Sequence, residues 1–218
     1  MSQARIEHLS TSGAFALDGG SWEVDNNVWL VGDDQEVIVI DPAHDSDAVA
    51  AAVGERQVSA ILLTHGHNDH VSEALAVQRA VGGRIHLNPE DAMLWEQVHG
   101  HTAPDVDITD GDTFTVSDVR LTAIHTPGHS PGSTCFYSED LADEHHSGGP
   151  VLFSGDTLFQ GGPGATGRSY SSYELILDSI EGRIFNDLPE ETRVHTGHGP
   201  TTRVGDEKPQ LEEWRKQA

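Results

Sequence analysis

The 218-residue chain has a single cysteine and few basic side chains. Cys135 has no second cysteine to pair with, so a fold held together by internal disulfides is excluded. Only 12 lysines and arginines stand against 36 aspartates and glutamates, and the formal net charge is -24. A nucleic-acid-binding protein needs a basic surface to neutralise phosphates. The sequence has no cluster of Lys and Arg to form one, so nucleic acid is excluded as a partner.

Long apolar runs are missing as well. No segment approaches the roughly 20 apolar residues that a membrane-spanning helix requires, and residues 1–8 lack the apolar core of a secretory signal peptide. We therefore expect a cytoplasmic protein with no membrane partner. Hydrophobic residues make up 36% of the chain and charged residues 22%, a polar composition that still supports a folded core. The length favours one domain over residues 1–218.

Strand and helix signals alternate along the chain. Compact apolar runs bounded by turn residues predict strands at 27–31, 36–40, 58–63, 84–87, 113–116, 119–124, 133–137, 151–153 and 193–196. Helical spacing with capping residues predicts helices at 46–53, at 71–81, from Pro89 onward and at 172–185. This alternation predicts a layered α/β fold in which helices cover the sheets.

Histidine is abundant, with 14 copies, and several of them lie close together. The segment Thr64-His65-Gly66-His67-Asn68-Asp69-His70 follows a predicted buried strand and precedes a predicted helix. Its three histidines and its aspartate can converge in the turn at the strand end, and imidazoles with a carboxylate suit zinc or iron. The alternative is a polar turn with surface histidines, and the density of ligands argues against it.

Further candidate ligands follow other predicted strands. His129 comes after the strand that ends near Ile124, Asp156 after the strand at 151–153, and His198 after the strand at 193–196. Each is directly preceded by a glycine, which lets the backbone approach a centre closely. We expect one edge of the sheets to collect these loops beside the histidine-rich turn.

In order along the chain, these motifs resemble those of the metallo-β-lactamase fold hydrolases. The resemblance implies a four-layer αβ/βα sandwich with two divalent metal ions at its edge. By this resemblance, the first metal is bound by His65, His67 and His129. The second is bound by Asp69, His70 and His198, and Asp156 bridges the two. Zinc is the metal it implies, with iron or manganese as alternatives.

Three local segments are similar to small glyoxalase II-like proteins: residues 125–133, 155–159 and 197–202. This similarity implies a small-molecule thioester as the substrate, since two metal ions can activate water and polarise an ester-like carbonyl. The chain also looks like actinobacterial members of the branch, which makes a mycothiol conjugate one expected substrate. Asp69 is expected to orient the attacking water and to carry its proton to the leaving thiolate.

Two further residues are candidates at the site. Asp41, after the strand at 36–40, either hydrogen-bonds a ligand histidine or caps the turn before Pro42. Arg168 lies beside the glycine-rich segment 161–167, and it either binds a substrate carboxylate or forms an ordinary ion pair.

Other functions remain open at the level of the sequence. A persulfide dioxygenase-like protein in the same fold would use one iron at a set resembling His65, His67 and His129. A lactonase or β-lactamase would use the same activated water on another carbonyl. A metal-binding protein without catalytic activity is the third class.

Overall fold

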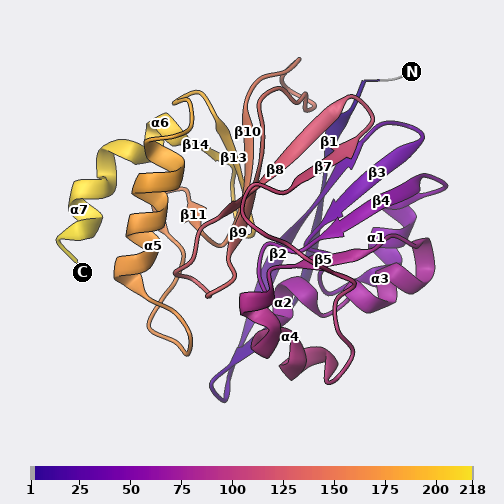
Figure 1. Ribbon diagram of the computed structural model, residues 1–218, viewed down its shortest axis with the longest axis horizontal. Coiled ribbons are helices and arrows are strands. Elements are labelled where there is room, and N and C mark those ends of the chain that lie inside the picture. Colours follow the sequence, from indigo (N-terminus) through magenta and orange to yellow (C-terminus); the bar gives the residue numbers. More distant parts are fainter. Residues whose placement is uncertain (1–2, 218) are drawn as a thin grey trace.

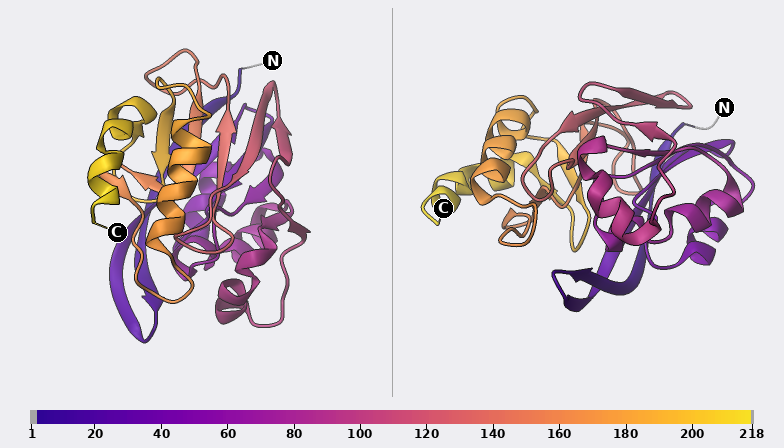
Figure 2. Two further views of the ribbon diagram at one scale, coloured as in Figure 1. Left: turned by 60° about the vertical axis from the view of Figure 1, so that its left-hand side comes forward. Right: turned by 60° about the horizontal axis from the view of Figure 1, so that its bottom comes forward.

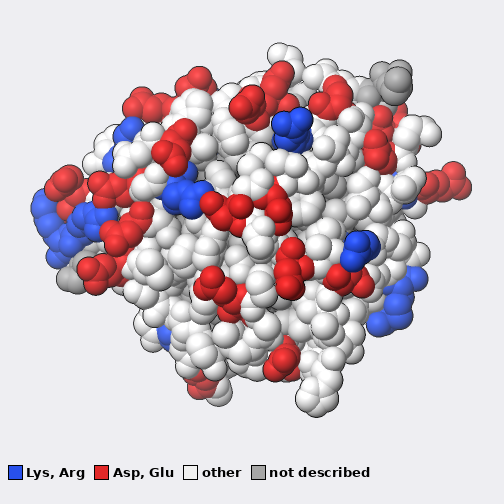
Figure 3. Space-filling model, in the orientation of Figure 1, with Lys and Arg blue, Asp and Glu red and all other residues white. Residues whose placement is uncertain are grey.

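Two six-stranded mixed sheets pack face to face in the computed structural model, which describes residues 3–217. Helices cover the outer face of each sheet, and Figures 1 and 2 show the resulting four layers. This is the αβ/βα sandwich predicted from the resemblance. No helix among the described residues is long and apolar enough to span a bilayer. Acidic side chains are scattered over the face seen in Figure 3, whereas basic ones form small separate groups.

The first sheet contains the N-terminal half of the chain. Its strands, in spatial order, are β1 (Arg5–Leu17), β2 (Gly20–Gly32), β3 (Glu36–Ile40), β4 (Gln57–Leu62), β5 (Ile85–Leu87) and β6 (Val106–Asp107). The first three strands pair antiparallel, and β3 to β6 pair parallel. Because β3 and β4 run in the same direction, the loops after Ile40 and Leu62 leave from the same edge of the sheet.

The second sheet contains the C-terminal half. Its spatial order is β14 (Thr202–Arg203), β13 (Arg193–Thr196), β10 (Val151–Gly155), β9 (Thr134–Ser138), β8 (Val119–His125) and β7 (Thr113–Val116). A separate pair is formed by β11 (Leu158–Phe159) and β12 (Gly162–Pro163). Strands β10 and β13 are parallel, so the turns that follow them also lie at one edge.

The helices flank the sheets on the outside. On the first sheet lie α1 (Ser46–Val53), α2 (Asn68–Val71), α3 (Ala74–Val81), the 3-10 turn Pro89–Asp91 and α4 (Ala92–His99). On the second lie α5 (Tyr173–Ser179), the π-helical turn Ile180–Phe185, α6 (Val204–Glu207), the 3-10 turn Lys208–Gln210 and α7 (Leu211–Arg215). Three buried apolar clusters fill the spaces between the four layers, one between the sheets and one under each helical layer.

The predicted strands are present, but the structure differs from the sequence prediction in several elements. Strand β1 was not predicted, because its polar and small residues show no clear strand pattern, yet it pairs with β2 along its whole length. The helix predicted at 71–81 begins only at Ala74, because Val71 is the last residue of the separate short helix α2. The helix predicted at 172–185 changes to π-helical geometry after Ser179. The C-terminal helices α6 and α7 were not predicted either.

Candidate metal centre

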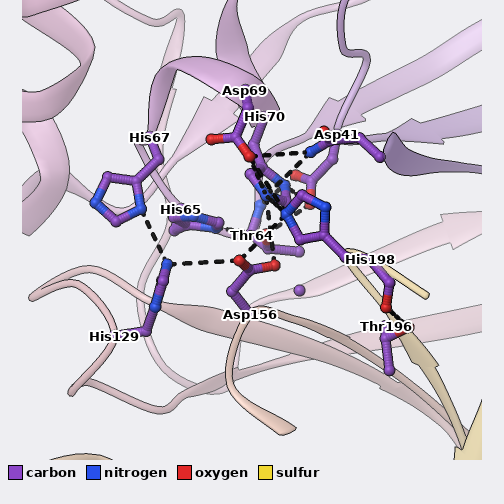
Figure 4. A network of polar contacts seen from close by, with 12 residues as sticks. Asp41, Thr64, His65, His67, Asp69, His70, His129, Asp156, Thr196 and His198 are labelled. Carbon is purple, nitrogen blue, oxygen red and sulfur yellow. Dashed lines mark hydrogen bonds and ion pairs between the residues drawn. The ribbon is translucent and has the colours of Figure 1, made fainter. Parts of the chain in front are cut away.

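The predicted ligands come together where loops from both sheets meet (Figure 4). The turn after β4 carries the histidine-rich segment, the loop between β8 and β9 carries His129, the turn after β10 carries Asp156, and the loop after β13 carries His198. All four loops leave from the ends of strands whose cores are buried. The framework beneath the site is therefore held by regular sheet pairing.

Three histidines form a first cluster. The ligand atoms of His65, His67 and His129 all lie within 4.8 Å of one another. His129 Nδ1 donates a hydrogen bond to the carbonyl oxygen of Ala165 at 2.8 Å, so its Nε2 carries the free lone pair. That Nε2 lies 2.9 Å from Nδ1 of His67. Neutral imidazoles arranged in this way can share one cation.

A second cluster contains one carboxylate and two histidines. Asp69, His70 and His198 also place their ligand atoms within 4.8 Å of one another. His198 Nδ1 donates to the carbonyl oxygen of Asp25 at 2.7 Å, and its Nε2 lies 3.3 Å from Oδ2 of Asp69. In both histidines of this cluster, Nδ1 forms a hydrogen bond to another residue of the protein, and Nε2 faces the other members of the cluster.

Asp156 lies between the two clusters. Its Oδ2 is 3.6 Å from Nε2 of His129 in the first cluster and 3.4 Å from Nε2 of His198 in the second. Its Oδ1 is 3.4 Å from Nε2 of His70. One carboxylate therefore faces ligand atoms of both clusters.

Several donor atoms of the site have no protein partner. His65 Nε2, His67 Nε2 and Asp69 Oδ1 are buried and make no hydrogen bond. Buried polar atoms are rarely left without a partner, because losing the hydrogen bonds of water costs about 1 to 3 kcal/mol for each group. Imidazole nitrogens and carboxylate oxygens are the donors that zinc, iron and manganese accept. The residues fit two divalent cations.

The electrostatics of the site favour cations as well. Burial raises the pKa of Asp69, but His70 and His198 outweigh it and lower this pKa to about 2. Burial and the neighbouring imidazoles hold the pKa of His65 well below its ordinary value. Burial opposes protonation of His198, but Asp156 and Asp69 outweigh it and raise the pKa of His198 to about 10. In the metal-free protein the proton on His198 thus partly compensates the carboxylates, and a metal ion bound to His198 would displace that proton.

Asp41 makes the contact expected for a residue that orients a ligand. Its Oδ2 accepts a hydrogen bond from Nδ1 of His70 at 3.0 Å and another from the Thr64 hydroxyl at 2.6 Å. Its Oδ1 accepts from the backbone N–H of Thr64 at 2.7 Å. Asp41 therefore holds the start of the ligand turn and fixes the tautomer of His70.

Asp91 is a buried supporting residue that the sequence analysis missed. Its carboxylate accepts hydrogen bonds from the backbone N–H groups of Gly66 at 2.8 Å and Gly132 at 2.6 Å, and from the hydroxyl of Ser130 at 2.7 Å. It thereby joins the turn that carries His65 to the loop that carries His129. In the sequence Asp91 resembles an ordinary acidic residue at a helix start, so no local signal identified it.

Asn26 is the second residue that was missed. Its amide nitrogen lies 3.3 Å from Oδ2 of Asp69 and 3.3 Å from Nε2 of His70. Its amide oxygen is 2.9 Å from Nε2 of His44, whose N–H can hold the amide in this orientation. Asn26 is a polar residue within a strand, and only its burial marks it.

Arg168 lies at the edge of the site and is held by aromatic rings. Its guanidinium is 3.8 Å from the ring centroid of Trp22 and 5.4 Å from that of Phe15, and the Phe15 ring meets the ring of His67 edge-on at 5.4 Å. Among residues 3–217 no carboxylate oxygen lies within 4.0 Å of it. Arg168 was expected either to form an ordinary ion pair or to bind a substrate carboxylate. The described residues form no such ion pair with it.

Comparison with known proteins identifies the family. The sequence profile of the metallo-beta-lactamase superfamily matches residues 22–216. The chain belongs to this superfamily. It is 33% identical to the probable metallo-hydrolase YqgX of Bacillus subtilis, over 85% of this chain and 90% of that protein. It is 30% identical to the hydroxyacylglutathione hydrolase GloC of Haemophilus influenzae, over 84% and 89%.

A solved structure shows the same similarity. TTHA1623 in a di-iron-bound form superposes with a TM-score of 0.71 at 30% identity, and the match covers 85% of this chain and 93% of that one. Together with the two ligand clusters, these relatives identify the chain as a metallo-hydrolase of the metallo-beta-lactamase superfamily.

Proposed function

We propose that this protein hydrolyses the thioester of a small thiol by means of water activated between two divalent cations. The observation that carries the proposal is the position of Asp156, whose carboxylate faces ligand atoms of both clusters. A single-metal centre would need only one of these clusters.

Each cluster would hold one cation. His65, His67 and His129 would bind the first, Asp69, His70 and His198 the second, and Asp156 would offer an oxygen to each. Two such cations supply a nucleophilic water at neutral pH and polarise the carbonyl under attack. We propose zinc as the cation because neutral imidazoles and carboxylates suit it. Iron is the alternative, since the similar TTHA1623 was solved with two irons.

Asp69 is the proposed proton carrier. Its Oδ1 is buried and makes no hydrogen bond, so this oxygen has a free lone pair, whereas Asn26 and His198 lie at Oδ2. Its low pKa keeps it ionised at neutral pH. Asp69 would accept the proton of the attacking water at Oδ1 and transfer it to the departing thiolate.

The relatives and the position of Arg168 at the edge of the site both support a thioester as the substrate. Hydroxyacylglutathione hydrolases are among the relatives at about 30% identity. Arg168 carries an unpaired guanidinium stacked on Trp22, where it would bind a carboxylate of a thiol carrier such as glutathione. A mycothiol conjugate is the second candidate carrier, and its hydroxyl groups could accept hydrogen bonds from the same side chain.

Metal analysis together with a substrate panel tests the proposal. We expect two metal ions per chain and hydrolysis of lactoyl thioesters of glutathione or mycothiol. One iron per chain with sulfite formed from a persulfide would instead support persulfide oxygenation. Hydrolysis of lactones or β-lactams without hydrolysis of thioesters would show that the activated water attacks a lactone or β-lactam carbonyl instead. A fully metallated protein inert toward every substrate would refute an enzymatic function.

A further inference from the structure

A narrow cavity adjoins the metal centre. It has a volume of about 290 Å³ and lies between the end of β1 and helix α4. Leu17 lines it from β1, and Leu94 and Val98 line it from α4. Gly66 and His67 form the side nearest the ligand turn. His67 also belongs to the first ligand cluster, so a group bound in the cavity would contact a residue of that cluster.

The lining of the cavity carries no acidic residue, lysine or arginine. The amide of Asn68 is occupied, since it accepts from the backbone N–H of Ala16 and donates to the carbonyl oxygen of Ala14, both at 2.7 Å. Besides His67 and Asn68, Gln97 is the other polar side chain of the lining, whereas Leu17, Leu94 and Val98 are apolar. The cavity therefore has no acidic or cationic side chain for a ligand and suits an uncharged, largely apolar group.

Both walls of the cavity are held in place by the fold. The two hydrogen bonds of Asn68 tie strand β1 to the ligand turn. Helix α4 is held at its C-terminal end by a contact of 2.8 Å between Nε2 of His99 and the carbonyl oxygen of Val71. A Cβ atom on Gly66 would lie 2.9 Å from Cβ of Leu94, so only glycine allows this close approach. The cavity is preformed, which is typical of ligand sites.

We propose that this cavity binds the acyl chain of the substrate and selects uncharged, apolar acyl groups of up to about nine carbons. The inference rests on the proposed thioester hydrolysis. At about 30 Å³ for each water-sized group, a volume of about 290 Å³ has room for about nine such groups, so the cavity accepts a chain of medium length. The carbonyl would lie between the two ligand clusters, the chain would pass His67, and the polar thiol carrier would stay outside.

A series of acyl chain lengths tests the selection. We would measure kcat/KM of the metal-loaded enzyme for N-acetylcysteamine thioesters from acetyl to dodecanoyl. Each methylene that enters the cavity should raise kcat/KM about three- to fourfold, up to about nine carbons, after which the value should stop rising. A profile that is flat, or that declines from acetyl onward, would overturn the inference. If no thioester were hydrolysed at all, the proposed function would fail, and the binding experiment below would still decide what the cavity accepts.

Binding to the metal-free protein provides a readout that does not depend on activity. Saturation-transfer NMR should show binding of hexanamide but not of acetamide. Val98→Phe fills the cavity and should abolish the hexanamide signal, and it should lower the ratio of hexanoyl to acetyl turnover at least tenfold. Val81→Phe is the matched control, because Val81 and Val98 are both partly buried helical valines packed against the same apolar cluster, and Val81 does not line the cavity.

Two outcomes would contradict the assignment of the cavity. One is a hexanamide signal that survives in Val98→Phe, and the other is an equal loss in Val81→Phe. If the phenylalanine variant did not fold, Val98→Ala would serve instead. It enlarges the cavity and should shift the preferred acyl chain toward greater length, and an unchanged optimum would count against the inference.

Discussion

The two ligand clusters of the metal centre differ in burial and in charge. The first contains only histidines, and His65 is 1% exposed with an unpartnered Nε2. The second contains Asp69, and the His198 side chain is 24% exposed. Without metal, His198 of the second cluster contacts both Asp69 and Asp156, although Asp69 Oδ1 stays without a hydrogen bond, and the first cluster leaves Nε2 of His65 and His67 unpaired. The comparison teaches that a cation at the second cluster would have to displace more internal ion-pair contacts than one at the first.

The largest effect is expected at the residue that joins the clusters. Asp156→Asn removes the charge that both cations would share, so both sites should weaken together. Removing a group that merely orients a ligand costs about 10- to 100-fold, and this direct ligand should cost more in kcat/KM and in metal affinity. Metal analysis after dialysis checks the prediction. Retention of two ions with unchanged affinity would show that Asp156 does not face both sites in solution.

Substitution of one histidine in each cluster separates the two sites. His198→Ala should leave about one ion per chain, held by the first cluster, because the remaining donors of that cluster are intact. His67→Ala should release the first ion and weaken the second less. Titration of metal-free variants with zinc, followed by calorimetry, gives the affinities. If His198→Ala lost both ions while His67→Ala kept both, the assignment of these two histidines to two separate metal sites would be wrong.

The support under the second cluster is expected to have an intermediate effect. Asp41→Asn keeps the size of the side chain but removes the charge that accepts from His70 and Thr64. Metal affinity at the second site should fall about 10- to 100-fold. The first site should change less, although Thr64 also contacts His65. Asp25→Asn is the matched control, because His198 contacts only the backbone carbonyl of Asp25.

Arg168 tests whether substrate enters on the side of the first cluster. Arg168→Gln should raise KM for a glutathione thioester about tenfold, since a charged hydrogen bond is lost. Metal content should stay at the wild-type level, because the guanidinium contacts rings and no ligand atom. Steady-state kinetics with metal analysis check both statements. A change in kcat alone, with KM constant, would place Arg168 outside substrate binding.

A further prediction concerns the stability of the metal-free protein, and in particular its dependence on pH. Despite burial, Asp156 and Asp69 raise the pKa of His198 from 6.5 to about 10. The folded protein thus binds the proton more tightly than the unfolded chain, so this contribution is full below pH 6.5 and is lost as the pH rises toward 10. Urea unfolding from pH 6 to pH 10 should show this loss in the wild type and less of it in His198→Gln. Equal slopes would refute the assigned ion pairs.

The sequence predicted which residues lie close together at the site better than it predicted the residues that support them. His65, His67 and Asp69 lie in one short turn after a strand with an evident apolar pattern, so their proximity follows from local structure. Strand β1 has no such pattern, and it is stabilised by its pairing with β2. Asp91 was missed because its partners lie 25 and 41 residues away along the chain. A contact of that separation leaves no periodic signal in the sequence.

The sequence by itself determined the donor types and the layered α/β fold, because imidazoles, carboxylates and apolar strands act through local chemistry and spacing. The tertiary structure decided which donors form one cluster, and it placed Asp156 between the two. It also decided that Arg168 stacks on Trp22 and that a cavity opens beside His67. These features depend on the packing of segments far apart in the chain, and only the folded protein brings them within contact distance.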